Sequence, residues 1–274
     1  MTAVSLARRE DLWQTSGAKW EMRHRLELFR PSAAGAGIQM ALQVIGRAVS
    51  SVMRNGPRWA ARWALFHLSE RLWERRLHVS TARQQRFHSD AYSQLPESIP
   101  YEPSPYFLIN RVLRAVAKAP QGEVFLDYGS GMGRVVLRAA MLPFKRVIGV
   151  ELMPELTELA NQNREGARAL VSPLEFITAD ATQYIVPDDV TIIHLFNPFT
   201  GHVMAEVQAR VRESLERAPR ALRVIYAHSD DQVNLFAGCS WLRETKQIPT
   251  GVMWRMKVVV YETLAASLAA RAAA

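Results

Sequence analysis

Cysteine is almost absent from this chain of 274 residues, since Cys239 is the only one. An intramolecular disulfide is therefore excluded, and neither a cysteine-based zinc cluster nor a redox-active cysteine pair can form. A chain of this length buries a core large enough to need no such cross-link. These features favour a reducing, cytoplasmic environment, and the sequence predicts no bound metal.

Long hydrophobic runs are also missing. The most apolar window near the N-terminus, "PSAAGAGIQMALQVIG", is bracketed by Arg30 and Arg47. It is shorter than the roughly 20 apolar residues that a membrane span requires. The first residues, "MTAVSLARREDLW", include acidic side chains and lack the apolar stretch of a secretory signal. We therefore expect neither a transmembrane helix nor a signal peptide.

Basic charge is confined to one part of the chain. The net charge is +8, and residues 1–90 hold fifteen basic and seven acidic residues, whereas residues 91–274 hold nineteen of each. Five of the seven tryptophans also lie in residues 1–90. Four prolines in residues 93–105 then indicate an extended connector. We divide the chain into a basic, Trp-rich helical region (1–92), a main domain (93–262) and an Ala-rich tail (263–274).

The N-terminal region has the periodicity of helices. Apolar residues recur every three or four positions within residues 38–53, and a second helix is expected after Pro57, where tryptophans and arginines alternate. One interpretation is a small helical appendage that packs on the main domain and leaves its arginines in solvent. The alternative is a basic amphipathic surface for an anionic membrane or an acidic partner.

The main domain alternates between short apolar runs and helix-length segments. The runs are "EVFLDYG", "RVIGVE", "LEFITAD", "VTIIHLFNP" and "ALRVIYAHS", and the helix-length segments begin near Gly133, Pro154, Gly201 and Asp230. Uninterrupted apolar strands are typical of a parallel sheet covered by helices on both faces. The last two runs, "WLRETKQI" and "VMWRMKVVVYE", have no helix between them. The sequence thus predicts an α/β fold, a doubly wound, mostly parallel seven-stranded sheet with an antiparallel C-terminal edge pair.

A glycine-rich loop follows the first strand, in "FLDYGSGMGRVVLRAA". In a sheet of this kind the ligand binds at the carboxyl ends of the strands, where this loop turns into a helix. A dinucleotide-binding loop needs a third glycine at the position that Arg134 occupies, and no G-K-[S/T] of a phosphate-binding loop follows. The spacing of Gly129, Gly131 and Gly133 therefore argues against a nicotinamide cofactor. A nicotinamide-dependent enzyme is the least favoured of the three functional hypotheses for this chain.

The glycine loop lies between two strands that each end in an acid. This order of motifs resembles that of class I S-adenosylmethionine-dependent methyltransferases, and the resemblance spans residues 101–262. The resemblance implies that backbone at Gly129 and Gly131 passes beneath the cofactor, that Asp127 holds its methionyl ammonium and that Glu151 accepts hydrogen bonds from the ribose hydroxyls. A carboxylate suits a vicinal diol because it has two oxygens. Asp180 would contact the adenine amine. The implied cofactor residues are Asp127, Gly129, Ser130, Gly131, Gly133, Glu151, Leu152, Asp180 and Ala181.

The end of the fourth strand carries the residues expected to face the methyl acceptor. Asn197-Pro198-Phe199 resembles the Asn-Pro-Pro-aromatic motif of amino-group methyltransferases, with one proline missing, and would orient the acceptor. The other reading of Asn197 is a turn or cap before the next helix. His194 is expected to be a buried, hydrogen-bonded histidine rather than a base. His202 and His228 lie nearer the strand ends, and the sequence does not select a general base among them.

Two tyrosines precede the first strand in "YEPSPYFLINRV", a segment that resembles the part of related enzymes that folds over the cofactor. Tyr101 and Tyr106 would then form a lid on the acceptor pocket. Equally, both could pack the connector onto the domain.

The sequence therefore predicts an S-adenosylmethionine-dependent methyltransferase with an unidentified acceptor, for which an amine of a small molecule or a protein is favoured. The alternative is a binding protein that keeps the nucleoside pocket without turnover and acts through its basic N-terminal region. Nucleic acid is disfavoured as the acceptor, because residues 91–274 lack clustered basic side chains interleaved with base-stacking aromatics. Acceptor identity and oligomeric state do not follow from the sequence.

Overall fold

The computed structural model describes residues 56–82, 101–117, 119–230, 232–251 and 256–264. The helix expected within residues 38–53, the expected boundary at residue 92 and most of the Ala-rich tail lie outside these ranges. The chain divides into two compact units, residues 1–66 and residues 67–274. The division into residues 1–92, 93–262 and 263–274 stays a prediction.

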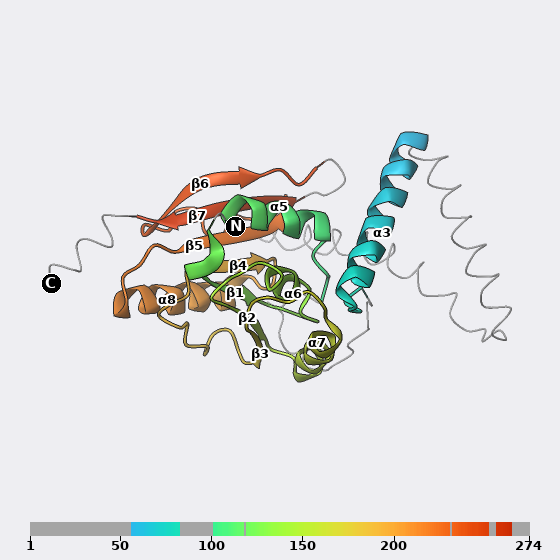
Figure 1. The fold of residues 1–274 in the computed structure, drawn as a ribbon. Coiled ribbons are helices and arrows are strands. Elements are labelled where there is room, and N and C mark those ends of the chain that lie inside the picture. Colours follow the sequence, from blue (N-terminus) through green and yellow to red (C-terminus); the bar gives the residue numbers. More distant parts are fainter. Residues whose placement is uncertain (1–55, 83–100, 118, 231, 252–255, 265–274) are drawn as a thin grey trace, which may run out of the picture. The chain divides into compact units, whose positions relative to one another are not determined.

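Seven strands form the single sheet that the sequence predicts. They are β1 (Val124–Tyr128), β2 (Arg146–Glu151), β3 (Leu174–Thr178), β4 (Ile192–Phe196), β5 (Arg223–Ser229), β6 (Leu242–Ile248) and β7 (Met256–Thr263). Their order across the sheet is β3-β2-β1-β4-β5-β7-β6, which Figure 1 shows from β3 at the bottom of the view to β6 at the top. Strand β1 thus lies inside the sheet, with β2 and β3 on one side of it and β4, β5, β7 and β6 on the other.

Strands β1 to β5 are parallel, and β7 pairs antiparallel with both β5 and β6. In the centre, Leu126 of β1 stands level with Ile148 of β2 and with Ile193 of β4. Parallel alignment brings the carboxyl ends of β1, β2, β4 and β5 to one edge of the sheet. Glu151 ends β2 at this edge, and the loops that leave the edge carry the glycines and Asn197.

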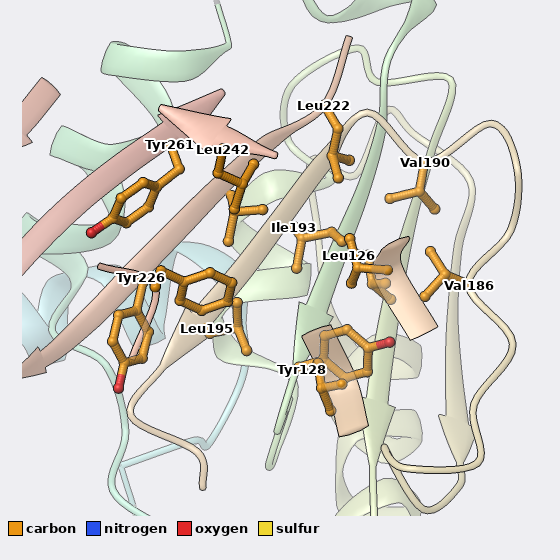
Figure 2. Packing of buried hydrophobic residues seen from close by; sticks show 14 of the residues in the cluster. Leu126, Tyr128, Val186, Val190, Ile193, Leu195, Leu222, Tyr226, Leu242 and Tyr261 are labelled. Carbon is orange, nitrogen blue, oxygen red and sulfur yellow. The ribbon is translucent and has the colours of Figure 1, made fainter. Parts of the chain in front are cut away.

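Helices cover both faces of the sheet. They are α5 (Tyr106–Val116), the short 3₁₀ turn η1 (Pro120–Gly122), α6 (Arg134–Ala139), α7 (Pro154–Gly166) and α8 (Gly201–Arg217). Alternate strand residues face opposite sides: Phe125 and Ile192 pack with α5 and α6, whereas Leu126 and Ile193 pack with α8. Figure 2 shows the cluster on the α8 side, with Leu222 and Val190 at one end and Tyr128 and Tyr226 at the other.

The helix expected after Pro57 is present as α3 (Pro57–Leu77). No helix within the described ranges is long and apolar enough to span a bilayer.

The helix-length segment after Asp230 is not a helix. Among the described residues between β5 and β6, positions 235–238 form turns. The Asn234 side chain accepts a hydrogen bond from the Phe236 amide at 3.2 Å, and Gly238 adopts a φ of +90°. Local side-chain bonds and left-handed glycines compete with helix formation, so the segment stays irregular.

A buried arginine joins the end of α3 to the start of α6, within the unit of residues 67–274. The Arg134 guanidinium donates to Glu70 at 2.6 Å and to Glu74 at 3.2 Å, and its Nε donates to Thr81 Oγ1 at 2.6 Å. A further bond reaches the Ser104 carbonyl oxygen at 3.1 Å. Arg134 is only 4% exposed. Such a charge is tolerated because its donors are satisfied and two carboxylates oppose it.

Tyr106 completes this cluster. Its ring lies 4.5 Å below the Arg134 guanidinium carbon, and its hydroxyl donates to Glu74 at 2.9 Å. Its backbone amide donates to Glu70 at 2.8 Å. Burial raises the pKa of Glu70, and the neighbouring Arg134 charge opposes that rise. The start of α5 and the end of α3 are therefore fixed by the same ionic cluster.

Arg134→Met should lower the free energy of unfolding by about 3–5 kcal/mol, because it leaves two carboxylates buried without their counter-charge. Arg146→Met is the matched control, since Arg146 pairs with Asp189 in a more exposed position, where such pairs contribute about 1 kcal/mol or less. Urea unfolding measures both losses. Equal losses would contradict the structural role of Arg134.

Candidate functional site

The loop between β1 and α6 is a tight backbone turn built on three glycines. Gly129, Gly131 and Gly133 have φ values of +72°, +53° and +84°, which other residues adopt only with strain. The amides of Gly129 and Ser130 both donate to the Val150 carbonyl oxygen, at 2.9 and 3.1 Å. The loop is thereby held against the end of β2.

Two of these glycines also allow close contacts with other segments. A Cβ placed on Gly129 would lie 2.7 Å from Pro198 Cβ, and one on Gly131 would lie 2.2 Å from the Tyr101 ring. The structure therefore brings the glycine loop into contact with the Asn197-Pro198-Phe199 segment and with the residues before α5. These are the segments that the sequence assigns to cofactor, acceptor and lid.

Glu151 ends β2 and points its carboxylate at the same loop. It accepts hydrogen bonds from the amides of Gly131 at 2.8 Å and Met153 at 3.0 Å. Burial raises the pKa of Glu151, and these backbone bonds counteract the rise. Each carboxylate oxygen has a second lone pair, so Glu151 can still accept hydrogen bonds from a ligand's hydroxyls.

Asp127, near the end of β1, is paired with His194 of β4. The Asp127 carboxylate and His194 Nδ1 lie 2.7 Å apart, and each residue is 2% exposed. Burial raises the pKa of Asp127, and the hydrogen bond from His194 counteracts it. His194 is the buried, hydrogen-bonded histidine that the sequence predicts. The role of Asp127 toward a ligand ammonium stays a prediction.

The acid after β3 lies in a different setting. Asp180 is exposed, and its Oδ1 accepts bonds from the Thr182 amide and hydroxyl, both at 2.8 Å. It therefore caps a turn that includes Ala181, which is half-buried, as is Leu152 after β2. Among the described residues, no hydrogen bond or ion pair joins the Asp180 side chain to the glycine loop.

The segment after β4 is strained and partly unsatisfied. Asn197 has a φ of +45°, unusual for a residue other than glycine, and its amide donates to the Ala227 carbonyl oxygen of β5 at 2.8 Å. Its Oδ1 is buried and has no hydrogen-bond partner in the described parts of the chain. Phe199 is buried edge-on against Tyr128, with 6.3 Å between ring centroids. Strain of this kind at a strand end suits a binding residue.

The two expected lid tyrosines occupy different places. Tyr101 lies over Gly131, and its hydroxyl donates to the Thr81 carbonyl oxygen at 2.8 Å. Burial raises the pKa of Tyr101. Tyr106 is fully buried in the Arg134 cluster, so it packs the connector down, which is the second of the two roles that the sequence allows. Only Tyr101 is placed to cover the loop.

The sequence does not indicate that residues 70–81 contribute to this site, because it groups them with the basic N-terminal region (1–92). Thr81 contacts both Tyr101 and Arg134, and Glu70 and Glu74 neutralise the residue that directly follows the loop. The sequence of α3 nevertheless carries a signal for a buried ionic role. Glu70 and Glu74 stand four residues apart, on one face of a helix otherwise rich in arginine.

Unsatisfied buried polar atoms gather at the carboxyl edge. Six such side-chain atoms occur in the described residues, and four of them belong to residues within two positions of the carboxyl ends of β1, β4 and β5. The four are Tyr128 Oη, Ser130 Oγ, Asn197 Oδ1 and His228 Nε2, whereas Tyr226 lies in the middle of β5 and Glu123 precedes β1. Because buried polar groups are normally hydrogen-bonded, this concentration indicates a site for a polar ligand. Together with Glu151, these atoms fit a nucleoside-type cofactor and a polar second molecule.

Comparison with known proteins agrees with this geometry. Residues 125–223 match the sequence profile of a family described as methyltransferase domain. The match runs from β1 to the start of β5 and includes the glycine loop, Glu151 and Asn197. Over this segment the chain is similar to the methyltransferase-domain family, and the strand order is that of the class I methyltransferase fold.

A protein-lysine N-methyltransferase of Saccharolobus islandicus is 33% identical over 104 residues, which are 36% of this chain and 62% of that protein. The chain thus spans less than two thirds of that relative. An RNA methyltransferase from Salinibacter ruber, solved with S-adenosyl-L-homocysteine, is 21% identical over 59% of this chain and 92% of its own, with a TM-score of 0.44. An S-adenosylmethionine-dependent methyltransferase from Aquifex aeolicus is 14% identical over 57% and 89%, with a TM-score of 0.45.

Gly129→Ala should lower the free energy of unfolding by about 1–3 kcal/mol, because the new Cβ adopts a strained φ and meets Pro198. Gly122→Ala is the control, since no atom lies within 4 Å of its Cβ position; we expect a change within about 0.5 kcal/mol. Thermal unfolding of both variants provides the measurement. If both changes are small, the contact between the loop and Pro198 is not tight.

Proposed function

We propose that this chain is an S-adenosylmethionine-dependent methyltransferase whose acceptor is an amine of a protein or a small molecule. The observation that carries the proposal is the convergence of the glycine loop, Glu151 and Asn197 at one sheet edge, with Gly129 against Pro198. Cofactor-binding and acceptor-facing residues would then be neighbours, as in-line methyl transfer requires.

The cofactor half of the site is supported by the loop and by Glu151. The sulfonium of S-adenosylmethionine supplies an already activated methyl group. The chain's part is to bind and orient, with the left-handed glycines allowing backbone to approach a ligand closely. Glu151 would hold the ribose hydroxyls, and Asp127, kept in place by His194, would face the ammonium. Asp180 and Ala181 would border the adenine, with Leu152 packing on it.

The acceptor half is supported by Asn197 and by the curated relative. Asn197 Oδ1 is a buried acceptor without a partner among the described residues, and an amine N–H is a donor that would satisfy it. The relative is named as a protein-lysine N-methyltransferase, which favours a primary amine. Pro198 and Phe199 would fix the position of Asn197, and Tyr101 would cover the site.

The basic helical region would serve partner choice. We expect it to contact an acidic partner or an anionic membrane surface, because the excess of basic charge lies within residues 1–90. This role is independent of residues 70–81, which support the glycine loop.

Calorimetric titration with S-adenosylmethionine, S-adenosylhomocysteine and NADH in parallel tests the cofactor. We expect binding of both sulfur nucleosides and none of NADH. Transfer of a labelled methyl group to polylysine and to n-butylamine then tests the acceptor class. Binding without transfer to either amine would favour a non-catalytic binding protein or another acceptor, and absence of binding would overturn the proposal.

Glu151→Gln should weaken S-adenosylmethionine binding about 10- to 100-fold, because hydrogen bonds to a charged acceptor contribute about 1.5–3 kcal/mol. Glu158→Gln removes the same charge from an exposed position of α7 and should leave the affinity unchanged. Calorimetry measures both dissociation constants. Unchanged affinity in Glu151→Gln would place the ribose elsewhere.

A further inference from the structure

His228 lies beside Asn197 at the carboxyl edge. Strands β4 and β5 are paired up to Phe196 and Ala227, so Asn197 and His228 are the next residues of the two parallel strands. The Asn197 amide donates to the Ala227 carbonyl oxygen at 2.8 Å and holds the two strand ends together. Any molecule that reaches Asn197 is therefore close to the end of β5.

The hydrogen bonding of His228 determines which ring nitrogen is basic. His228 Nδ1 lies 2.9 Å from the Ser229 carbonyl oxygen. A carbonyl oxygen only accepts hydrogen bonds, so Nδ1 must carry the proton. In the neutral ring the lone pair then resides on Nε2. The backbone of the same strand thus presents His228 as a base at Nε2.

Nothing in the described residues uses that lone pair. His228 is 2% exposed, and its Nε2 is buried without a hydrogen-bond partner there. Its ring stacks on Tyr226, with 5.1 Å between centroids, and the Tyr226 hydroxyl also has no partner in the described ranges. Burial raises the pKa of Tyr226 to about 12, so this phenol stays neutral. A buried acceptor left without a donor is unfavourable, and a bound substrate that donates a hydrogen bond would recover that loss.

The other two histidines near the site do not offer the same group. His194 is engaged through Nδ1 with the Asp127 carboxylate. His202, on α8, is 75% exposed by its side chain and lies 3.9 Å from Glu206. His228 alone among the three combines burial, a fixed tautomer and an unused nitrogen.

We infer that His228 is a catalytic residue, the base that receives the proton of the acceptor amine. The inference rests on the proposed function. The acceptor ammonium first releases one proton to His228 Nε2, giving an imidazolium and freeing the nitrogen lone pair. As this lone pair forms the nitrogen–methyl bond, the sulfur–methyl bond breaks and its electron pair stays on sulfur, which becomes a neutral thioether, while the methylated nitrogen carries the positive charge. Asn197 Oδ1 accepts the hydrogen bond of another N–H and orients the lone pair.

Two substitutions at His228 separate basicity from shape. His228→Asn keeps an amide donor near the Nδ1 position for the Ser229 carbonyl but removes the base, and His228→Gln places a non-basic amide near the Nε2 position. His202→Asn is the control at an exposed histidine. In single-turnover transfer from S-adenosylmethionine to polylysine, we expect both His228 variants to be slower by about 10²- to 10⁴-fold. Cofactor affinity by calorimetry and the rate of His202→Asn should not change.

Transfer by His228→Asn at the wild-type rate would overturn the role of His228 while leaving the proposed function intact. Absence of transfer by the wild-type protein to both polylysine and n-butylamine would instead overturn the amine acceptor, and the role of His228 with it. A measurement on the wild-type protein guards against variants that do not fold. In ¹⁵N-histidine spectra of the complex with S-adenosylhomocysteine, we expect an unprotonated His228 Nε2 whose resonance shifts on addition of n-butylamine. A protonated Nε2, or no shift, contradicts the inference.

Discussion

The buried charge of Arg134 is the constraint on which the rest of the site depends. A guanidinium with 4% exposure needs acceptors for its donors and carboxylates for its charge. Glu70 and Glu74 supply the carboxylates, Thr81 supplies a hydroxyl, and Tyr106 supplies an aromatic face. Because Arg134 directly follows Gly133, satisfying it also fixes the start of α6 and the exit of the glycine loop. A dinucleotide-binding loop would have glycine at this position. Here Arg134 binds the loop's exit to the end of α3.

At the carboxyl edge of the sheet, backbone groups and side chains differ in how far their hydrogen bonds are satisfied. At the carboxyl edge, backbone groups are well paired: the loop amides bond to Val150, and Glu151 accepts two amides. Among the described residues, Ser130 Oγ, Asn197 Oδ1 and His228 Nε2 near the same edge have no hydrogen-bond partner. The backbone is thus rigid where the side chains are available, and such preorganisation lowers the cost of binding.

Local patterns were sufficient for the strands and for the glycine loop. Uninterrupted apolar runs such as "RVIGVE" predicted buried parallel strands, and the spacing of the glycines predicted the turn, because both depend on residues close in sequence. The prediction of a helix after Asp230 was wrong. The length of that segment suggested a helix, whereas Asn234 and Gly238 favour turns. Tyr106 was equally suited to a lid and to the core, and only its contacts with Glu74 and Arg134 decide between them.

The sequence by itself determined the α/β class, the sheet with its antiparallel edge, and the residues Asp127, Glu151 and Asn197 at strand ends. These follow from periodicity and from the rule that parallel strands end at one edge. Only the tertiary structure decided that Glu70, Glu74 and Thr81 support the loop, that His194 pairs with Asp127, and that His228 Nε2 has no hydrogen-bond partner among the described residues. The physical reason is that these contacts join residues far apart in the chain, and whether a buried polar atom is satisfied depends on partners that no local pattern specifies.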